Sequence, residues 1–186
     1  MTRLGLHINA DRSLDRVVDF CARVQPAVVK WLEPRREVIE QCKVVSPDTI
    51  HIARLVYEPQ EPDRYTDFQN RTLSKAREFI GLIDYWEGWN EHIPEGADPD
   101  DIREFARQEV GLAQRLNEMG VGALIGGFST GVLDSGNIDA FSKALDYIQE
   151  VGWKKCALHF HEYAGAYMGL FVETPDGLNQ WDNAAG

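Results

Sequence analysis

The segment formed by residues 85–91 ends on a polar pair, Asn90 and Glu91, whose side chains could take part in acid–base chemistry. An apolar run, residues 79–83, precedes the segment, and a turn-rich loop, residues 92–96, follows it. This order predicts a buried strand with a polar tip. Barrel enzymes keep their catalytic groups at the carboxyl ends of their strands, where a glutamate can act as a general acid or base. A glutamate that only caps a loop is the alternative, and the Trp-Asn-Glu context favours a functional role.

A second group of polar side chains ends the last apolar run of the chain. His159, His161 and Tyr163 occupy every second position, and the period of a strand places them on one face. Two tryptophans, Trp31 and Trp89, fall at other predicted strand ends, where an aromatic ring could stack on the flat face of a sugar ring. Together these residues predict a cleft that combines a carboxylate, imidazoles and aromatic rings, although each of them could also be an ordinary core residue.

Short apolar segments alternate with longer amphipathic segments along the chain, and this alternation indicates βαβ units with a parallel sheet. The predicted strands cover residues 4–8, 27–32, 49–56, 85–91, 121–126 and 156–160. The predicted helices lie between them, around residues 14–21, 38–42, 65–79, 100–119 and 138–151. Residues 164–186 have the composition of a loop, with a turn at residues 174–177.

An open doubly wound sheet and a closed barrel both fit this alternation. The open sheet needs a glycine-rich phosphate-binding turn after the first strand, and residues 7–10 have no such pattern. Polar and aromatic residues at the strand ends favour a barrel instead. The sequence therefore predicts an α/β fold of (β/α)8 TIM-barrel type that is incomplete, with six parallel strands and five helices, in a single domain spanning residues 1–186.

The Trp-Asn-Glu sequence of residues 89–91, at the end of the fourth predicted strand, resembles the corresponding strand of clan A glycoside hydrolases. These are (β/α)8 retaining enzymes that cleave O-glycosidic bonds. The resemblance implies that Glu91 is the general acid/base and that Asn90 hydrogen-bonds the sugar 2-hydroxyl. The His-x-Tyr tip of the sixth strand resembles that of several clan A families, which implies that His161 lines the sugar site and that Tyr163 orients the nucleophile.

The resemblance leaves one catalytic role without a residue. In that family the nucleophile is a glutamate at the end of the seventh strand, and no residue of this chain can be assigned to it. A complete barrel usually takes about 250 residues, and this chain has 186. We therefore expect a glycoside hydrolase-like protein with Glu91 as its acid/base, Trp31 and Trp89 as further substrate contacts, and no activity for this chain alone. The first and sixth strands would be sheet edges, through which copies could form a homo-oligomer.

Glu87 lies deeper in the fourth predicted strand than Glu91 and needs a partner, because an isolated buried carboxylate is costly. Arg54, at the end of the third predicted strand, is the expected partner. We predict that this pair is structural and not catalytic.

Two other functions fit the same strand ends. A metal-dependent barrel isomerase or hydrolase could use His7, Glu91, His159 and His161, since imidazole and carboxylate together suit zinc or manganese. A non-catalytic carbohydrate-binding protein could keep the aromatic cleft without the nucleophile. Metal analysis of the purified protein separates the first alternative from a glycosidase, and sugar binding without turnover would support the second. The leading hypothesis needs no metal or other cofactor.

The net charge of −11 argues against nucleic acid or an anionic membrane as a partner, because phosphate binding needs clustered lysine and arginine residues. A carbohydrate is the expected partner. The three cysteines have no spacing typical of a disulfide framework or a zinc site. No apolar stretch is long enough for a signal peptide or a membrane span, so the sequence predicts a cytoplasmic protein.

Overall fold

The computed structural model describes residues 5–8, 14–56, 62–94, 96–129, 132–133, 137–161, 171–173 and 179–181. Within these ranges one parallel sheet contains six strands, each paired with the next along the chain: β1 (Gly5–Ile8), β2 (Val28–Leu32), β3 (Ile50–Arg54), β4 (Tyr85–Glu87), β5 (Gly122–Ser129) and β6 (Cys156–His161). A doubly wound sheet reverses its strand order at one point, whereas a barrel does not. The order therefore fits the predicted TIM-barrel type and not the open sheet.

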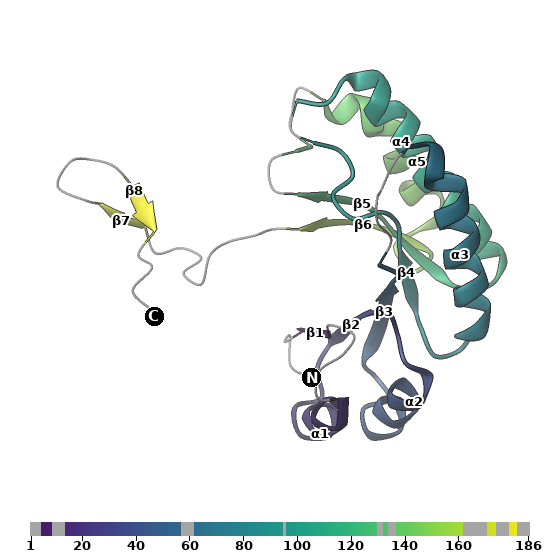
Figure 1. Cartoon of the computed structure of the whole chain (residues 1–186), viewed down its shortest axis with the longest axis vertical. Coiled ribbons are helices and arrows are strands. Elements are labelled where there is room, and N and C mark those ends of the chain that lie inside the picture. Colours follow the sequence, from purple (N-terminus) through teal and green to yellow (C-terminus); the bar gives the residue numbers. More distant parts are fainter. Residues whose placement is uncertain are drawn as a thin grey trace.

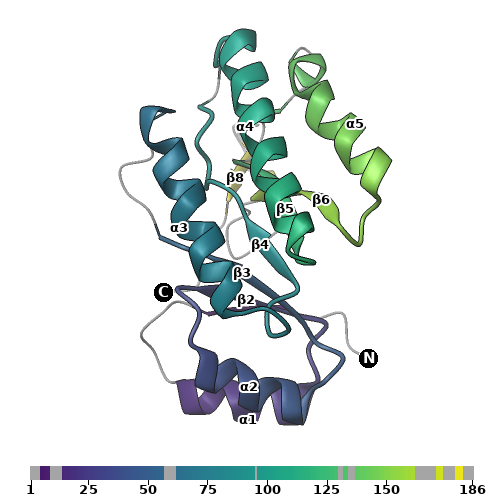
Figure 2. The same ribbon diagram turned by 90° about the vertical axis from the view of Figure 1, so that its right-hand side faces the viewer.

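The crossovers between these strands contain the five predicted α helices: α1 (Leu14–Val24), α2 (Arg36–Val45), α3 (Tyr65–Glu78), α4 (Pro99–Glu118) and α5 (Ser142–Val151). Two short 3-10 turns, η1 (Pro62–Arg64) and η2 (Ile138–Phe141), precede α3 and α5. The helices cover one side of the curved sheet, with α1 and α2 side by side at one end and α3, α4 and α5 along the rest (Figure 1, Figure 2). The described part of the chain thus has the form of an incomplete barrel wall.

None of the helices in the described ranges is both long and apolar enough to cross a bilayer.

Helix α4 matters most for the site, and its ends follow the usual sequence signals. The Asp98 side chain accepts a hydrogen bond of 2.8 Å from the amide of Asp100, and Pro99 occupies the first turn, where its missing N–H has no cost. Gly120, which follows the helix, has a φ of 76° that favours glycine. The helix is therefore fixed in register against the sheet, and its buried face carries Glu109 toward the strands.

The largest differences from the sequence-based expectation concern β4, β5 and the C-terminal segment. Strand β4 ends at Glu87, four residues before the predicted end, while β5 extends to Ser129. Residues 171–173 and 179–181, which were expected to be loop, form a two-stranded antiparallel sheet, β7 (Phe171–Glu173) and β8 (Asn179–Trp181). The turn predicted at residues 174–177 lies outside the described residues. Strands of three residues leave too short an alternation to be recognised in the sequence.

Strands β1 and β6 are the edges of the described sheet, each paired with a single neighbour. Unpaired strand edges favour association with another chain. We therefore predict that purified protein forms a homo-oligomer, which light scattering after size-exclusion chromatography should detect as a mass at least twice that of one chain. A monomer that persists at micromolar concentration would contradict this prediction.

Candidate active site

A network of charged side chains lies on the side of the sheet opposite the helices. The centre of this network is Glu87 of β4, whose side chain is only 3% exposed. Its carboxylate lies 2.7 Å from the Nζ atom of Lys30 on β2, 4.0 Å from the Nε atom of Arg54 on β3 and 3.9 Å from the Nδ1 atom of His159 on β6. The predicted contact between Glu87 and Arg54 is present, but Lys30 is the closer partner. The Glu87 carboxylate of β4 therefore contacts side chains from three other strands, β2, β3 and β6.

The alternation of β2 explains why Lys30 faces this network. Its neighbours Val29 and Trp31 are buried on the helix side, so the period of two turns Lys30 to the opposite side. Burial is the main cause that lowers the pKa of Lys30, while the charges of Glu87 and Glu91 act in the opposite direction. We did not predict a role for Lys30, although a lysine between two buried apolar residues of a strand is the signal that could have found it.

Asn90 and Glu91 belong to the same region as the network. Arg54 donates a hydrogen bond from Nη1 to the side-chain oxygen of Asn90. The Glu91 carboxylate lies close enough to Lys30 for its charge to raise the pKa of that lysine. Both residues are half-buried. The structure therefore brings the predicted Asn–Glu pair together with Arg54 and Lys30 at the carboxyl end of β4.

The backbone of Glu91 has a left-handed conformation, with a φ of 52°, which is uncommon for a residue other than glycine. Its amide donates a hydrogen bond of 2.7 Å to the carbonyl oxygen of Gly127. Gly127 itself has a φ of 50°, and a Cβ atom there would lie 2.3 Å from the carbonyl oxygen of Trp89. The register shift of β5 between Gly126 and Phe128 marks a bulge at this point. The bulge thus lets the two backbones approach closely and holds Glu91 in place.

Trp89 does not lie in the cleft, contrary to the sequence-based prediction. Its side chain is 1% exposed, and its ring packs against the rings of Tyr65, Phe68 and His92, with centroid distances of 4.8, 5.7 and 4.3 Å. The prediction assumed that the strand alternation continues to the tip. Because β4 ends at Glu87, the backbone turns after Gly88 and directs Trp89 toward the helices.

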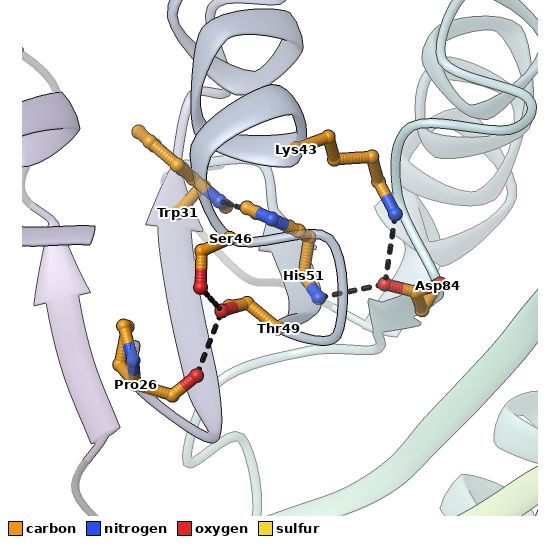
Figure 3. A network of polar contacts seen from close by, with 7 residues as sticks. All are labelled: Pro26, Trp31, Lys43, Ser46, Thr49, His51 and Asp84. Atoms are coloured by element: carbon orange, nitrogen blue, oxygen red, sulfur yellow. Dashed lines mark hydrogen bonds and ion pairs between the residues drawn. The ribbon is translucent and has the colours of Figure 1, made fainter. Parts of the chain in front are cut away.

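Trp31 is also a core residue and not a sugar platform. Its side chain is 1% exposed, and its Nε1 atom donates a hydrogen bond of 2.9 Å to the Nδ1 atom of His51 (Figure 3). The backbone amide of His51 is bound in turn by Asp84, which also contacts Lys43. Burial lowers the pKa of His51 to about 4, so the imidazole remains a neutral acceptor for Trp31. The hydrogen bond between Trp31 and His51 thus links β2 to β3 on the side of the sheet that the helices cover.

The sixth-strand residues are described only in part. His161 is the last residue of β6, where its backbone pairs with that of Ser129. Tyr163 lies outside the described residues, so its predicted place beside Glu91 stays a prediction. His7 pairs with Lys30 in the β1–β2 ladder and is exposed. Within the described ranges, no three side chains of the types that bind metals form a group that could hold an ion.

Comparison with known proteins identifies the fold. No protein-family model and no curated protein matches the chain. Among solved structures the chain is similar to a family 2 AP endonuclease from Brucella melitensis, with a TM-score of 0.54 and 15% identity over 84% of this chain and 67% of that one. It is also similar to an endo-β1,6-glucanase, with a TM-score of 0.52 and 12% identity over 87% of this chain and 51% of that one.

The fold is of the TIM-barrel type, and the chain has six of the parallel strands of this fold in its described part. It spans about two thirds of the AP endonuclease and about half of the glucanase. At such low identity the similarity is one of fold. The resemblance to clan A glycoside hydrolases therefore stays a prediction that the chemistry of the site has to support.

Proposed function

We propose that this chain carries the acid/base part of a glycoside hydrolase-like active site, with Glu91 as the general acid/base. The observation that carries the proposal is the position of Asn90 and Glu91 at the carboxyl end of β4, next to Arg54 and Lys30. The catalytic groups of TIM-barrel enzymes lie at this end of the strands. The left-handed backbone of Glu91 adds support, because non-glycine residues held in such conformations cluster at functional sites.

In this proposal Glu91 protonates the glycosidic oxygen as the bond to the leaving sugar breaks. The Arg54 guanidinium holds the amide oxygen of Asn90, so the amide nitrogen is the end that would donate to a sugar hydroxyl. His161 and Tyr163 keep their proposed roles as a sugar contact and as the residue that orients the nucleophile. A retaining mechanism also needs a second carboxylate about 5 Å from the first, and none is assigned in this chain.

The similarity to an endo-β1,6-glucanase suggests the sugars to try first. We expect the 186-residue chain to bind β1,6-linked glucotetraose in a calorimeter and to hydrolyse 4-nitrophenyl glycosides negligibly. In a form of the protein that also supplies the second carboxylate, Glu91→Gln should lower kcat by about 10²- to 10⁴-fold, the usual contribution of a general acid. Glu104→Gln, on the exposed face of α4, is the matched control and should leave kcat unchanged.

Two outcomes would change this assignment. Rapid hydrolysis by the 186-residue chain that survives Glu91→Gln would place the chemistry elsewhere and end the glycosidase proposal. Sugar binding without turnover in every form of the protein would favour the non-catalytic carbohydrate-binding alternative.

A further inference from the structure

Glu109 is a buried carboxylate for which the proposed reaction has no direct use. It lies on α4, it is 0% exposed, and it faces the helix side of β4 and β5. Burying a carboxylate is costly unless hydrogen bonds replace the lost water, and an apolar residue would suit a helix face packed on a sheet. A glutamate at this position therefore needs hydrogen-bond donors around it, which an apolar side chain would not need.

Three donors from three different segments reach the Glu109 carboxylate. Its Oε1 atom accepts a hydrogen bond of 2.7 Å from the Tyr65 hydroxyl of α3 and one of 3.4 Å from the backbone amide of Trp89. Its Oε2 atom accepts one of 3.1 Å from the backbone amide of Gly126. A Cβ atom on Gly88 would lie 2.2 Å from both oxygens, so the carboxylate fills the space that a side chain at residue 88 would take.

The two backbone amides belong to the two segments that hold Glu91. Trp89 lies two residues before Glu91, and Gly126 precedes Gly127, whose carbonyl accepts the hydrogen bond from the Glu91 amide. Both amides lie where the regular strand ladder is interrupted, at the end of β4 and at the bulge of β5. The Glu109 side chain thus binds both segments, on the opposite side of the sheet from Glu91 and Asn90.

We propose that Glu109 is a positioning residue that fixes the Asn90–Glu91 tip against the β5 bulge through its hydrogen bonds to the amides of Trp89 and Gly126. It acts without touching the sugar. The inference rests on the proposed function for the role of Glu91, whereas the placement of the tip by Glu109 can be measured without any ligand.

The decisive variant is Glu109→Gln, which keeps the shape of the side chain and replaces one acceptor oxygen by a donor. In either orientation of the amide, one of the two backbone N–H groups then faces an NH₂ group. We expect hydrogen exchange at the amides of Trp89, Gly126 and Glu91, followed by NMR, to accelerate about 10- to 100-fold, as for the loss of one buried hydrogen bond. The affinity for β1,6-linked glucotetraose should fall by a comparable factor.

Two matched variants separate positioning from a general loss of stability. Tyr65→Phe removes the third donor but leaves both backbone bonds, so exchange at Glu91 should stay within about threefold of the wild type. Glu104→Gln removes an exposed carboxylate of the same helix and should leave the exchange unchanged. Unaltered exchange at Glu91 in Glu109→Gln, or the same acceleration in Tyr65→Phe, would overturn the proposal.

A second measurement serves if Glu109→Gln does not fold. In the wild type, the amide resonances of Trp89, Gly126 and Glu91 should shift together as the Glu109 carboxyl ionises between pH 5.5 and 8.5. The other titratable groups that act on Glu109 or are affected by its charge include Tyr65 of α3, Glu87 of β4 and Cys156 of β6. The imidazoles of His92, 4.3 Å from the Trp89 ring, and of His159, beside Gly127, are followed through their own ring resonances so that their contribution can be separated. Burial raises the pKa of Tyr65 well above its usual value and that of Cys156 to about 12, so neither of them ionises in this range. Resonances at Glu91 that do not move with those of Trp89 and Gly126 would overturn the proposal.

The two proposals fail in different ways. If glucotetraose does not bind to the wild type but exchange at Glu91 accelerates in Glu109→Gln, the positioning role stands and the choice of sugar is wrong. If glucotetraose binds equally well to the wild type and to Glu109→Gln while the exchange is unchanged, the sugar site stands and the role of Glu109 is wrong.

Discussion

Replacing Lys30 by methionine should destabilise the protein by about 3 kcal/mol, because the change removes the closest counter-charge of a buried carboxylate. Glu87, which is 3% exposed in the wild type, would keep as partners only Arg54, now at 4.0 Å, and His159, now at 3.9 Å. Breaking one side of a buried ion pair typically costs about 3–5 kcal/mol, and these two partners place the expected value at the lower end. Urea denaturation at pH 7 measures the free energy of unfolding for this comparison.

A double-mutant cycle tests whether the loss of unfolding free energy arises from the interaction between Lys30 and Glu87. Removing both charges with Lys30→Met and Glu87→Leu should cost about 1–3 kcal/mol less than the sum of the two single changes, because the double variant leaves no lone charge between these positions. Arg23→Met is the matched control, since Arg23 forms an exposed ion pair with Asp19. That change should cost less than about 1 kcal/mol. Equal effects of Lys30→Met and Arg23→Met would contradict a buried network.

The order and type of the main elements could be predicted from the sequence because their signals are local. A strand such as β2 or β5 is a short apolar run, and a helix such as α4 begins at an acidic cap with a proline and ends before a glycine. The barrel-type order of the strands followed from the polar strand ends and from the missing phosphate-binding turn. The short hairpin of β7 and β8 was not predicted, because strands of three residues are too short to show an alternation of apolar and polar residues.

The side-chain directions at the candidate site could be predicted only where a strand continues. Alternation correctly separates Glu87 from Trp86, but it fails at Trp89, two residues after β4 has ended. After the strand ends, the Trp89 amide donates a hydrogen bond to Glu109, which lies 20 residues later on α4. A pattern within the segment itself contains no information about such a partner.

The glycines at the β5 bulge also have a structural cause that lies in another part of the sequence. The pair Gly126-Gly127 is visible in the sequence and indicates an unusual backbone. The reason for it is the close approach of the Trp89 carbonyl oxygen, which belongs to another strand end. Trp31 differs from these cases, because the apolar residues on either side of Lys30 already indicate that Trp31 and Lys30 face opposite sides of the sheet.

The unfolding free energy should depend on pH through two buried groups that act in opposite directions. Burial raises the pKa of Glu109 to about 7, and the hydrogen bonds from Tyr65, Gly126 and Trp89 oppose this change. Burial lowers the pKa of His51 to about 4, with a smaller contribution of the same sign from Lys43 and an opposite one from Asp84. Displacements of this size from the ordinary values of 4.5 and 6.5 correspond to about 3 kcal/mol each.

The signs follow from the protons bound in the folded and unfolded states. Between pH 4.5 and 7 the folded protein keeps the Glu109 proton that the unfolded chain has lost, so stability falls as the pH rises through about 7. Between pH 4 and 6.5 the unfolded chain binds the proton that folded His51 excludes, so stability falls as the pH drops from 6.5 toward 4. In the wild type the two effects largely cancel across this range.

In a variant that lacks one of the two groups, the unfolding free energy should therefore depend on pH more steeply than in the wild type. Relative to the wild type, Glu109→Gln should gain about 3 kcal/mol of stability between pH 4.5 and pH 8, because its side chain has no proton to lose. His51→Asn keeps an acceptor for the Trp31 indole and should gain a similar amount relative to the wild type between pH 7 and pH 4. Urea denaturation at half-unit pH intervals measures both differences. A curve for either variant that runs parallel to that of the wild type would show that the corresponding group does not change its charge state on folding.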